Sequence, residues 1–161
     1  MTGDVVVRYF DAARDLRSLE ECVAEQQDVH RALESSWPEG RAIADSYVAY
    51  LEKECAAHNG RILIAQFGQQ VAGFACVAAK TSGESPDDPA CFAWVFDVYV
   101  KPEHRRRGVA SMLMAEAERF AQAQGATEVR LGVLERNAPA RAFYARRGFR
   151  DYTRVLTRSL K

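Results

Sequence analysis

The sequence has no long apolar run, no excess of charge of either sign and no cysteine pattern typical of a metal site. Because a membrane-spanning helix needs about 18 or more consecutive apolar residues, we expect no segment that spans a membrane. The 22 basic and 22 acidic residues balance, which argues against a nucleic-acid-binding protein with a broad basic surface. The N-terminal stretch lacks a basic region followed by apolar residues, so it predicts no signal peptide.

The four cysteines are scattered along the chain and lack the spacing of metal ligands. Each lies among apolar residues, which indicates buried, reduced thiols in a cytoplasmic protein. We therefore expect no metal site. The cysteines are Cys22, Cys55, Cys76 and Cys91.

Hydrophobic periodicity and turn residues predict a single α/β domain over residues 1–161, because no repeat, linker or low-complexity segment divides the chain. The predicted order is β-α-α-β-β-β-α-β-α-β. The predicted strands cover 4–10, a hairpin over 61–80, then 91–100, 127–134 and 151–160. The predicted helices follow the capping residue Asp11 and cover 39–58, 108–124 and 137–149, with a polar loop at 81–90.

The segment CFAWVFDVYV, residues 91–100, is rich in aromatic and β-branched residues and predicts a strand buried on both faces. Asp97 is its one charged residue, and a carboxylate is costly to bury without a partner or a role. The residues alone leave three interpretations open: an ion pair with an arginine, contact with a substrate ammonium group, or a catalytic base.

Three consecutive arginines, Arg105, Arg106 and Arg107, stand directly before Gly108 and the helix predicted there. The free amides and the dipole at a helix start favour an anion, and glycine lets the backbone approach a ligand closely. Ala110, which is nearly as small, follows two positions later. The stretch predicts a phosphate site, with a solvated basic turn as the alternative; it has no Walker ending.

Two stretches together resemble the signatures of the Gcn5-related N-acetyltransferase (GNAT) family. Its acetyl-CoA loop has the pattern Q/R-x-x-G-x-G/A, which Arg105, Gly108 and Ala110 match. The stretch NAPARAFYARRGF resembles the second signature. The matching positions there are Asn137, Ala140, Phe143, Tyr144, Gly148 and Phe149. The order of elements also fits, so the resemblance covers nearly the whole chain.

The resemblance implies a fold, a donor and an activity. The fold is a mixed, mostly antiparallel sheet flanked by helices. The activity is acetyl-CoA-dependent N-acetyl transfer by direct attack in a ternary complex. The pantetheine arm would lie between the fourth and fifth strands, against backbone groups of Val98, Tyr99 and Val100, with Asn137 on the other side. The pyrophosphate would bind the amides of Arg106, Arg107, Gly108, Val109, Ala110 and Ser111, together with the Ser111 hydroxyl.

The resemblance also implies catalytic roles. Tyr144 stands where the family places the acid that protonates the leaving thiolate; packing is the alternative for Tyr144 and the preferred role of Phe143. Many members carry a glutamate one position before Asp97, where this chain has Phe96, so the base is not carried over directly. A backbone amide at residue 98 or 100, freed by a bulge, would stabilise the carbonyl oxygen.

The expected acceptor is a primary amine of a small molecule or a peptide. Three acidic loop residues would attract it and Trp37 would offer an aromatic wall, although such loops are normally only solvated. These residues are Glu34, Asp87 and Asp88. We expect His104 at the surface, and a nucleophilic Cys91 is disfavoured because buried thiols are usually inert.

Two other functions remain open: a non-catalytic acyl-CoA-binding or regulatory module, and an interaction domain whose basic loop binds an acidic partner. Either a monomer or a homodimer is compatible with the sequence.

Overall fold

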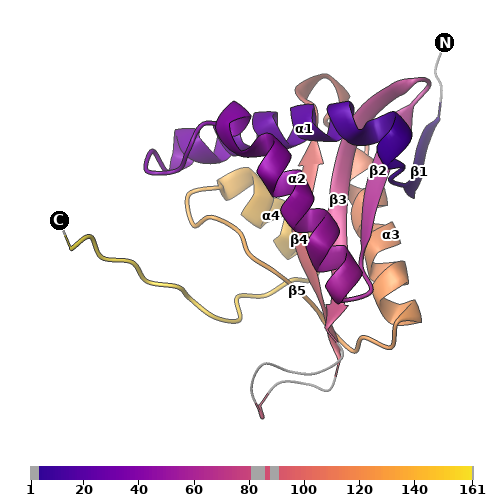
Figure 1. Ribbon diagram of the computed structural model, residues 1–161. Coiled ribbons are helices and arrows are strands. Elements are labelled where there is room, and N and C mark those ends of the chain that lie inside the picture. Colours follow the sequence, from indigo (N-terminus) through magenta and orange to yellow (C-terminus); the bar gives the residue numbers. More distant parts are fainter. Residues whose placement is uncertain (1–3, 81–85, 88–90, 161) are drawn as a thin grey trace.

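The computed structural model describes residues 4–80, 86–87 and 91–160, and within them the strands form one five-stranded sheet in the order β1-β2-β3-β4-β5 (Figure 1). The first four strands pair antiparallel, and β5 pairs parallel to β4. This confirms the mixed, mostly antiparallel sheet flanked by helices. The strands are β1 Val5–Tyr9, β2 Arg61–Phe67, β3 Gln70–Lys80, β4 Phe92–Val100 and β5 Val129–Leu131. The helices are α1 Ala12–Leu33, α2 Gly40–Ala57, the short 3₁₀ turn η1 Pro102–His104, α3 Val109–Ala123 and α4 Ala138–Arg146.

Each face of the sheet carries its own apolar core. Alternation along β2 sends Ile62 and Ile64 towards α1 and α2, and sends Leu63 and Ala65 towards α3. Helix α4 packs at the edge of the α3 layer through Phe143, which is half-buried. None of the described helices is both long enough and apolar enough to cross a bilayer.

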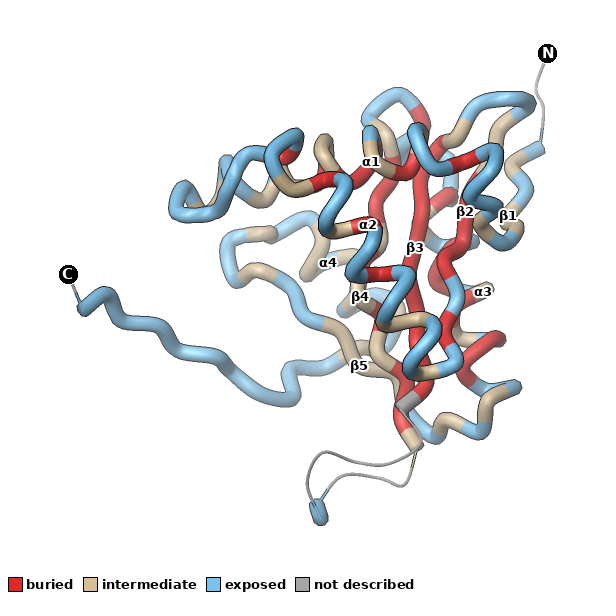
Figure 2. The backbone as a smooth tube through the Cα atoms, viewed as in Figure 1, coloured by how far each residue is buried: buried red, intermediate tan, exposed pale blue. Residues whose placement is uncertain are grey.

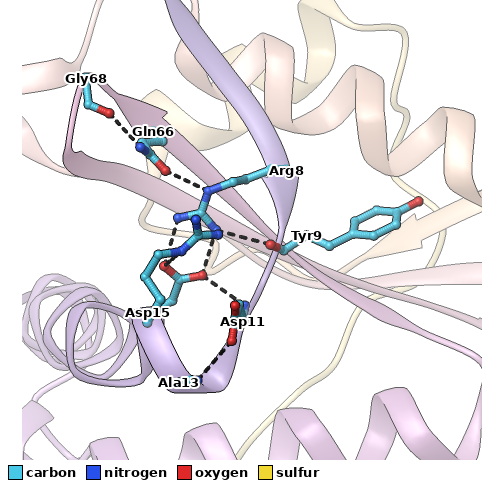
Figure 3. A network of polar contacts seen from close by, with 8 residues as sticks. Arg8, Tyr9, Asp11, Ala13, Asp15, Gln66 and Gly68 are labelled. Atoms are coloured by element: carbon cyan, nitrogen blue, oxygen red, sulfur yellow. Dashed lines mark hydrogen bonds and ion pairs between the residues drawn. The ribbon is translucent and has the colours of Figure 1, made fainter.

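A buried ion pair joins the start of α1 to β1 (Figure 3). The Arg8 guanidinium donates to both carboxylate oxygens of Asp15, at 2.6 and 2.8 Å. Asp15 also accepts from the amide of Asp11, which caps the helix as predicted by accepting from the amide of Ala13. The Arg8 hydrogen bond lowers the pKa of Asp15, so the carboxylate stays charged although it is only 1 % exposed.

Strand β4 contains a bulge at Phe96. Val77 of β3 lies opposite Val95, whereas the preceding residue Cys76 lies opposite Asp97. Between these two pairs β3 advances by one residue and β4 by two, so Phe96 is the extra residue of the bulge.

The bulge reverses which side chains of β4 point to which face. Before it, the odd-numbered Val95 belongs to the core under α3. After it, the odd-numbered Tyr99 belongs to the core under α1 and α2, and Asp97 is hydrogen-bonded to Tyr47 of α2. The single extra residue thus places the Asp97 carboxylate beneath α1 and α2.

Strands β4 and β5 pair only over Ala93–Val95 and Val129–Leu131. Beyond Val95 that edge of β4 has no strand partner among the described residues. This is the gap that the resemblance implied between the fourth and fifth strands.

Two strand predictions differ from the structure. The strand predicted at 127–134 is shorter, because only Val129–Leu131 finds a ladder on β4. The strand predicted at 151–160 is wrong: this segment has no regular structure and is exposed throughout (Figure 2). A strand is completed by the hydrogen bonds of a neighbour, so a β-branched composition does not form one alone. Most of the predicted loop at 81–90 lies outside the described residues.

Helix α2 begins directly against the backbone of α1, at Gly40. A Cβ atom at this position would lie 2.0 Å from the carbonyl oxygen of Ala24. The Gly40 amide also donates to the carboxylate of Asp28 at 2.8 Å. Only glycine allows this contact, which sets the position of α2 on the sheet.

We expect Gly40→Ala to lower the free energy of unfolding by about 1–3 kcal/mol, because the added methyl group must displace the backbone of α1. Urea unfolding followed by circular dichroism measures the difference. Gly132→Ala is the matched control, since a Cβ atom there meets no atom within 4 Å. Equal stability of the two variants would contradict the close approach.

Candidate active site

A cavity of about 450 Å³ opens where β4 diverges from β5. Its walls come from α1, α2, the loop between them, β4, the segment after β5, and α4. The cavity therefore joins elements from both halves of the chain. Its polar and aromatic lining residues are Gln26, Gln27, His30, Trp37, Tyr47, Phe96, Asp97, Asn137 and Tyr144.

Asp97 is the buried carboxylate of this cavity, with 7 % of its surface exposed. The Tyr47 hydroxyl donates to it at 2.9 Å. Burial raises the pKa of Asp97 to about 6, and the hydrogen bonds from Tyr47 and Gln26 oppose that rise. No Arg or Lys of the described segments lies within ion-pair distance of Asp97, so the ion pair left open by the sequence is absent. The carboxylate can take a proton near neutral pH.

Tyr144 enters the cavity from α4. The predicted ends of this helix are confirmed: the Asn137 side chain accepts from the amide of Ala140 at 3.3 Å, and Gly148 has a φ of +88°. The Tyr144 ring packs edge-on against Phe149, at 5.6 Å between ring centroids. Burial raises the pKa of Tyr144 to about 12, with a further contribution from the charge of Asp97. Its hydroxyl therefore keeps its proton at neutral pH and can donate it.

The basic loop is shaped by its backbone. Arg106 and Gly108 both have positive φ, at +61° and +78°, and Gly108 is the N-cap residue of α3. No side chain caps this helix start, so the first amides of α3 remain available to an anion. The Arg105 guanidinium turns back, donates to the carbonyl of Val100 at 2.9 Å and lies over the Tyr99 ring. Arg105 thus positions the loop on the end of β4.

The structure brings together some of the residues predicted for the site and separates others. Asp97, Val98, Asn137 and Tyr144 line the cavity. Tyr99 does not line it, because its hydroxyl donates to Glu25 of α1. The loop residues Arg105 to Ser111 lie beyond the end of β4, at the turn into α3.

The residues predicted for the acceptor side also differ in whether they line the cavity. Trp37 and His30 line the cavity. Glu34 accepts from Ser36 and Asp87 is exposed, and neither residue lines it, whereas Asp88 lies outside the described residues. The expectation of a surface His104 is wrong: it is 5 % exposed and packs beside Phe67.

Sequence reasoning missed Tyr47 and Gln26, the two partners of Asp97. Tyr47 follows Ile43 at helical spacing, so it reads as an apolar-face residue. Its hydroxyl on that face was the available signal, because a buried hydroxyl needs a partner. Nothing in the sequence singles out Gln26 from the other polar residues of α1.

The sequence profile described as "Acetyltransferase (GNAT) family" matches residues 26–149. The chain belongs to the GNAT acetyltransferase family. The matched range contains every wall of the cavity except Val23, together with the basic loop. The resemblance drawn from the two short signatures is therefore confirmed, and the site lies within the part that defines the family.

Several relatives resemble this GNAT protein. Thialysine N-epsilon-acetyltransferase of Sus scrofa is 39% identical over 57 residues, which cover 35% of this chain and 34% of that protein. A transcriptional regulator from Bacillus halodurans C-125 has a TM-score of 0.75 at 19% identity and covers 98% of this chain and 100% of its own. The aminoglycoside N-acetyltransferase AAC(6')-Iy, solved in complex with CoA, has a TM-score of 0.74 at 20% identity over 99% and 96% of the two chains. The chain spans about a third of the length of the pig enzyme. The similarity to the two solved structures, at 19% and 20% identity, shows the fold alone.

Because its folded pKa of about 6 exceeds the ordinary value of 3.8, Asp97 binds its proton more tightly in the folded state. Its contribution to stability is present below pH 3.8 and is lost as the pH rises through about 6. We expect the stability of Asp97→Asn relative to the parent protein to increase by about 2–3 kcal/mol from acid pH to pH 8. Urea unfolding at a series of pH values measures this difference, and a flat difference would contradict the buried carboxylate.

Proposed function

We propose that this GNAT protein is an acetyl-CoA-dependent N-acetyltransferase that moves an acetyl group to a primary amine of a small molecule or peptide. The observation that carries the proposal is the placement of Asp97 and Tyr144 on one cavity, where β4 leaves β5. Family membership and the CoA complex of AAC(6')-Iy support acetyl-CoA as the donor. The donor supplies the acetyl thioester when bound.

The residues that would hold acetyl-CoA fit it chemically. The pyrophosphate would bind the free amides from Arg106 to Ser111, because the helix start is uncapped and a Cβ atom at Gly108 would meet no atom within 4 Å. The open edge of β4 from Val98 to Val100 offers backbone groups to the pantetheine amides. Asn137 uses its carbonyl oxygen as a helix cap, which leaves its amide NH₂ for the donor.

Three groups of the chain would carry the transfer by direct attack. Asp97 accepts a proton from the acceptor ammonium, since an alkylamine must be neutral to attack. A backbone amide of β4, at Val98 or Val100, donates to the carbonyl oxygen as negative charge develops there. Tyr144 would donate its proton to the sulfur as the C–S bond breaks. The tyrosinate would regain a proton, through water, from the acylated nitrogen, which loses its second proton as the amide forms.

The relatives support an amine acceptor. The names of the pig enzyme and of AAC(6')-Iy refer to thialysine and to aminoglycosides, and both compounds carry amines. A covalent route through Cys91 has no support in the geometry, because its thiol points to the carbonyl of Gln124 and it does not line the cavity.

Tyr144→Phe is expected to lower kcat by about 100-fold or more, because the leaving thiolate loses its proton donor. Thiol release from acetyl-CoA with a panel of primary amines measures the rate. Calorimetric titration should show acetyl-CoA binding unchanged, since only a hydroxyl is removed. Tyr9→Phe is the matched control, because Tyr9 is an exposed tyrosine of β1 that does not line the cavity.

Gly108→Glu tests the donor site separately. A carboxylate at position 108 would repel the pyrophosphate, so acetyl-CoA binding should be lost.

If the parent protein binds acetyl-CoA but releases no thiol with any amine, the result would favour the non-catalytic acyl-CoA-binding module. Unchanged turnover in Tyr144→Phe would remove the acid role from Tyr144.

A further inference from the structure

In the part of the chain that the structure describes, a single charged residue lines the acceptor side of the cavity. Among the described lining residues, Asp97 is the one Asp, Glu, Lys or Arg. A shallower hollow of about 480 Å³ adjoins the cavity and shares Trp37 and Tyr47 with it. No charged residue of the described chain lines this hollow. An acceptor lying across both would therefore meet one carboxylate and uncharged walls.

Aromatic rings form much of these walls. Tyr47 and Tyr50 lie 5.7 Å apart between ring centroids, and Tyr50 and Phe96 lie 6.1 Å apart. Trp37 stands edge-on to His30 at 5.5 Å. Burial lowers the pKa of His30, so its imidazole adds no positive charge at neutral pH. Trp37 and Tyr50 are 37 % and 43 % exposed, and both line the hollow.

Two arginines approach this region, and both are engaged elsewhere. Arg31 donates to the carbonyl of Trp37 at 3.2 Å and pairs with Glu39 at 3.8 Å. Arg136 donates to the carbonyl of Leu33 at 3.1 Å. Neither residue lines the cavity or the hollow. A carboxylate on the acceptor would thus be desolvated with no cation among the described lining residues to receive it.

On the basis of the proposed acetyltransferase activity, we propose that the acceptor is an apolar primary monoamine. It has one amine, an aromatic or branched aliphatic body and no carboxylate. The amine lies at Asp97, and the body lies along Trp37, Tyr47 and Tyr50. A second ammonium group would lose its hydration without a second carboxylate among the described lining residues to pair with, so polyamines fit poorly.

Matched pairs of amines test this class. Phenethylamine and phenylalanine differ by the carboxylate, and pentylamine and 1,4-diaminobutane differ by one methyl group replaced with an ammonium group. We expect kcat/KM for the monoamine to exceed that of its partner by about tenfold or more in each pair, because the extra charge is buried unpaired. Higher kcat/KM for the charged partners would overturn the class while leaving the enzyme intact.

Binding measured without turnover separates this inference from the activity on which it rests. Calorimetry with CoA present should detect phenethylamine and not phenylalanine. If phenethylamine binds and phenylalanine does not, but no amine causes thiol release, the acetyltransferase activity is refuted and the acceptor class stands. Equal binding of phenethylamine and phenylalanine would refute the acceptor class. Trp37→Ala should raise the KM for phenethylamine more than that for pentylamine, and Tyr9→Ala should change neither.

Discussion

The bulge at Phe96 is the constraint on which the rest of the site depends. It comes one residue after β4 stops pairing with β5, so two changes coincide in one strand. The first opens the gap between the strands, and the second turns Asp97 towards α1 and α2. Without the extra residue, Asp97 would share the face of Val95 and lie in the apolar core beneath α3.

Burial raises the pKa of two groups in the cavity, Asp97 and Tyr144, with different consequences for each. It raises the pKa of Asp97 to about 6, where a carboxylate can exchange protons near neutral pH. It raises the pKa of Tyr144 to about 12, where a phenol holds its proton. In the proposed function, the same low polarity would let the pair act as base and acid, and it would disfavour any further unpaired charge on a molecule that enters.

Much of the fold could be predicted because its signals are local. Asp11 and Asn137 cap helices, Gly68 turns the hairpin, and Gly108 is the N-cap residue of α3, as side-chain chemistry and positive φ require. The arginines show the limit of such reasoning: their charge is visible in the sequence, but Arg105 bonds a carbonyl and Arg107 lies over Phe67. In the proposed function, the backbone between them would form the anion site.

The sequence by itself determined the helices, most of the strands, the family and the two signatures, because capping, periodicity and glycine geometry act within a few residues. Only the tertiary structure decided which face receives Asp97 and that Tyr47 and Gln26 bind it, since one extra residue in β4 reverses the alternation. It also decided that residues 151–160 form no strand within the described chain. A strand is completed by hydrogen bonds to a neighbour, and the sequence of one segment does not contain that neighbour.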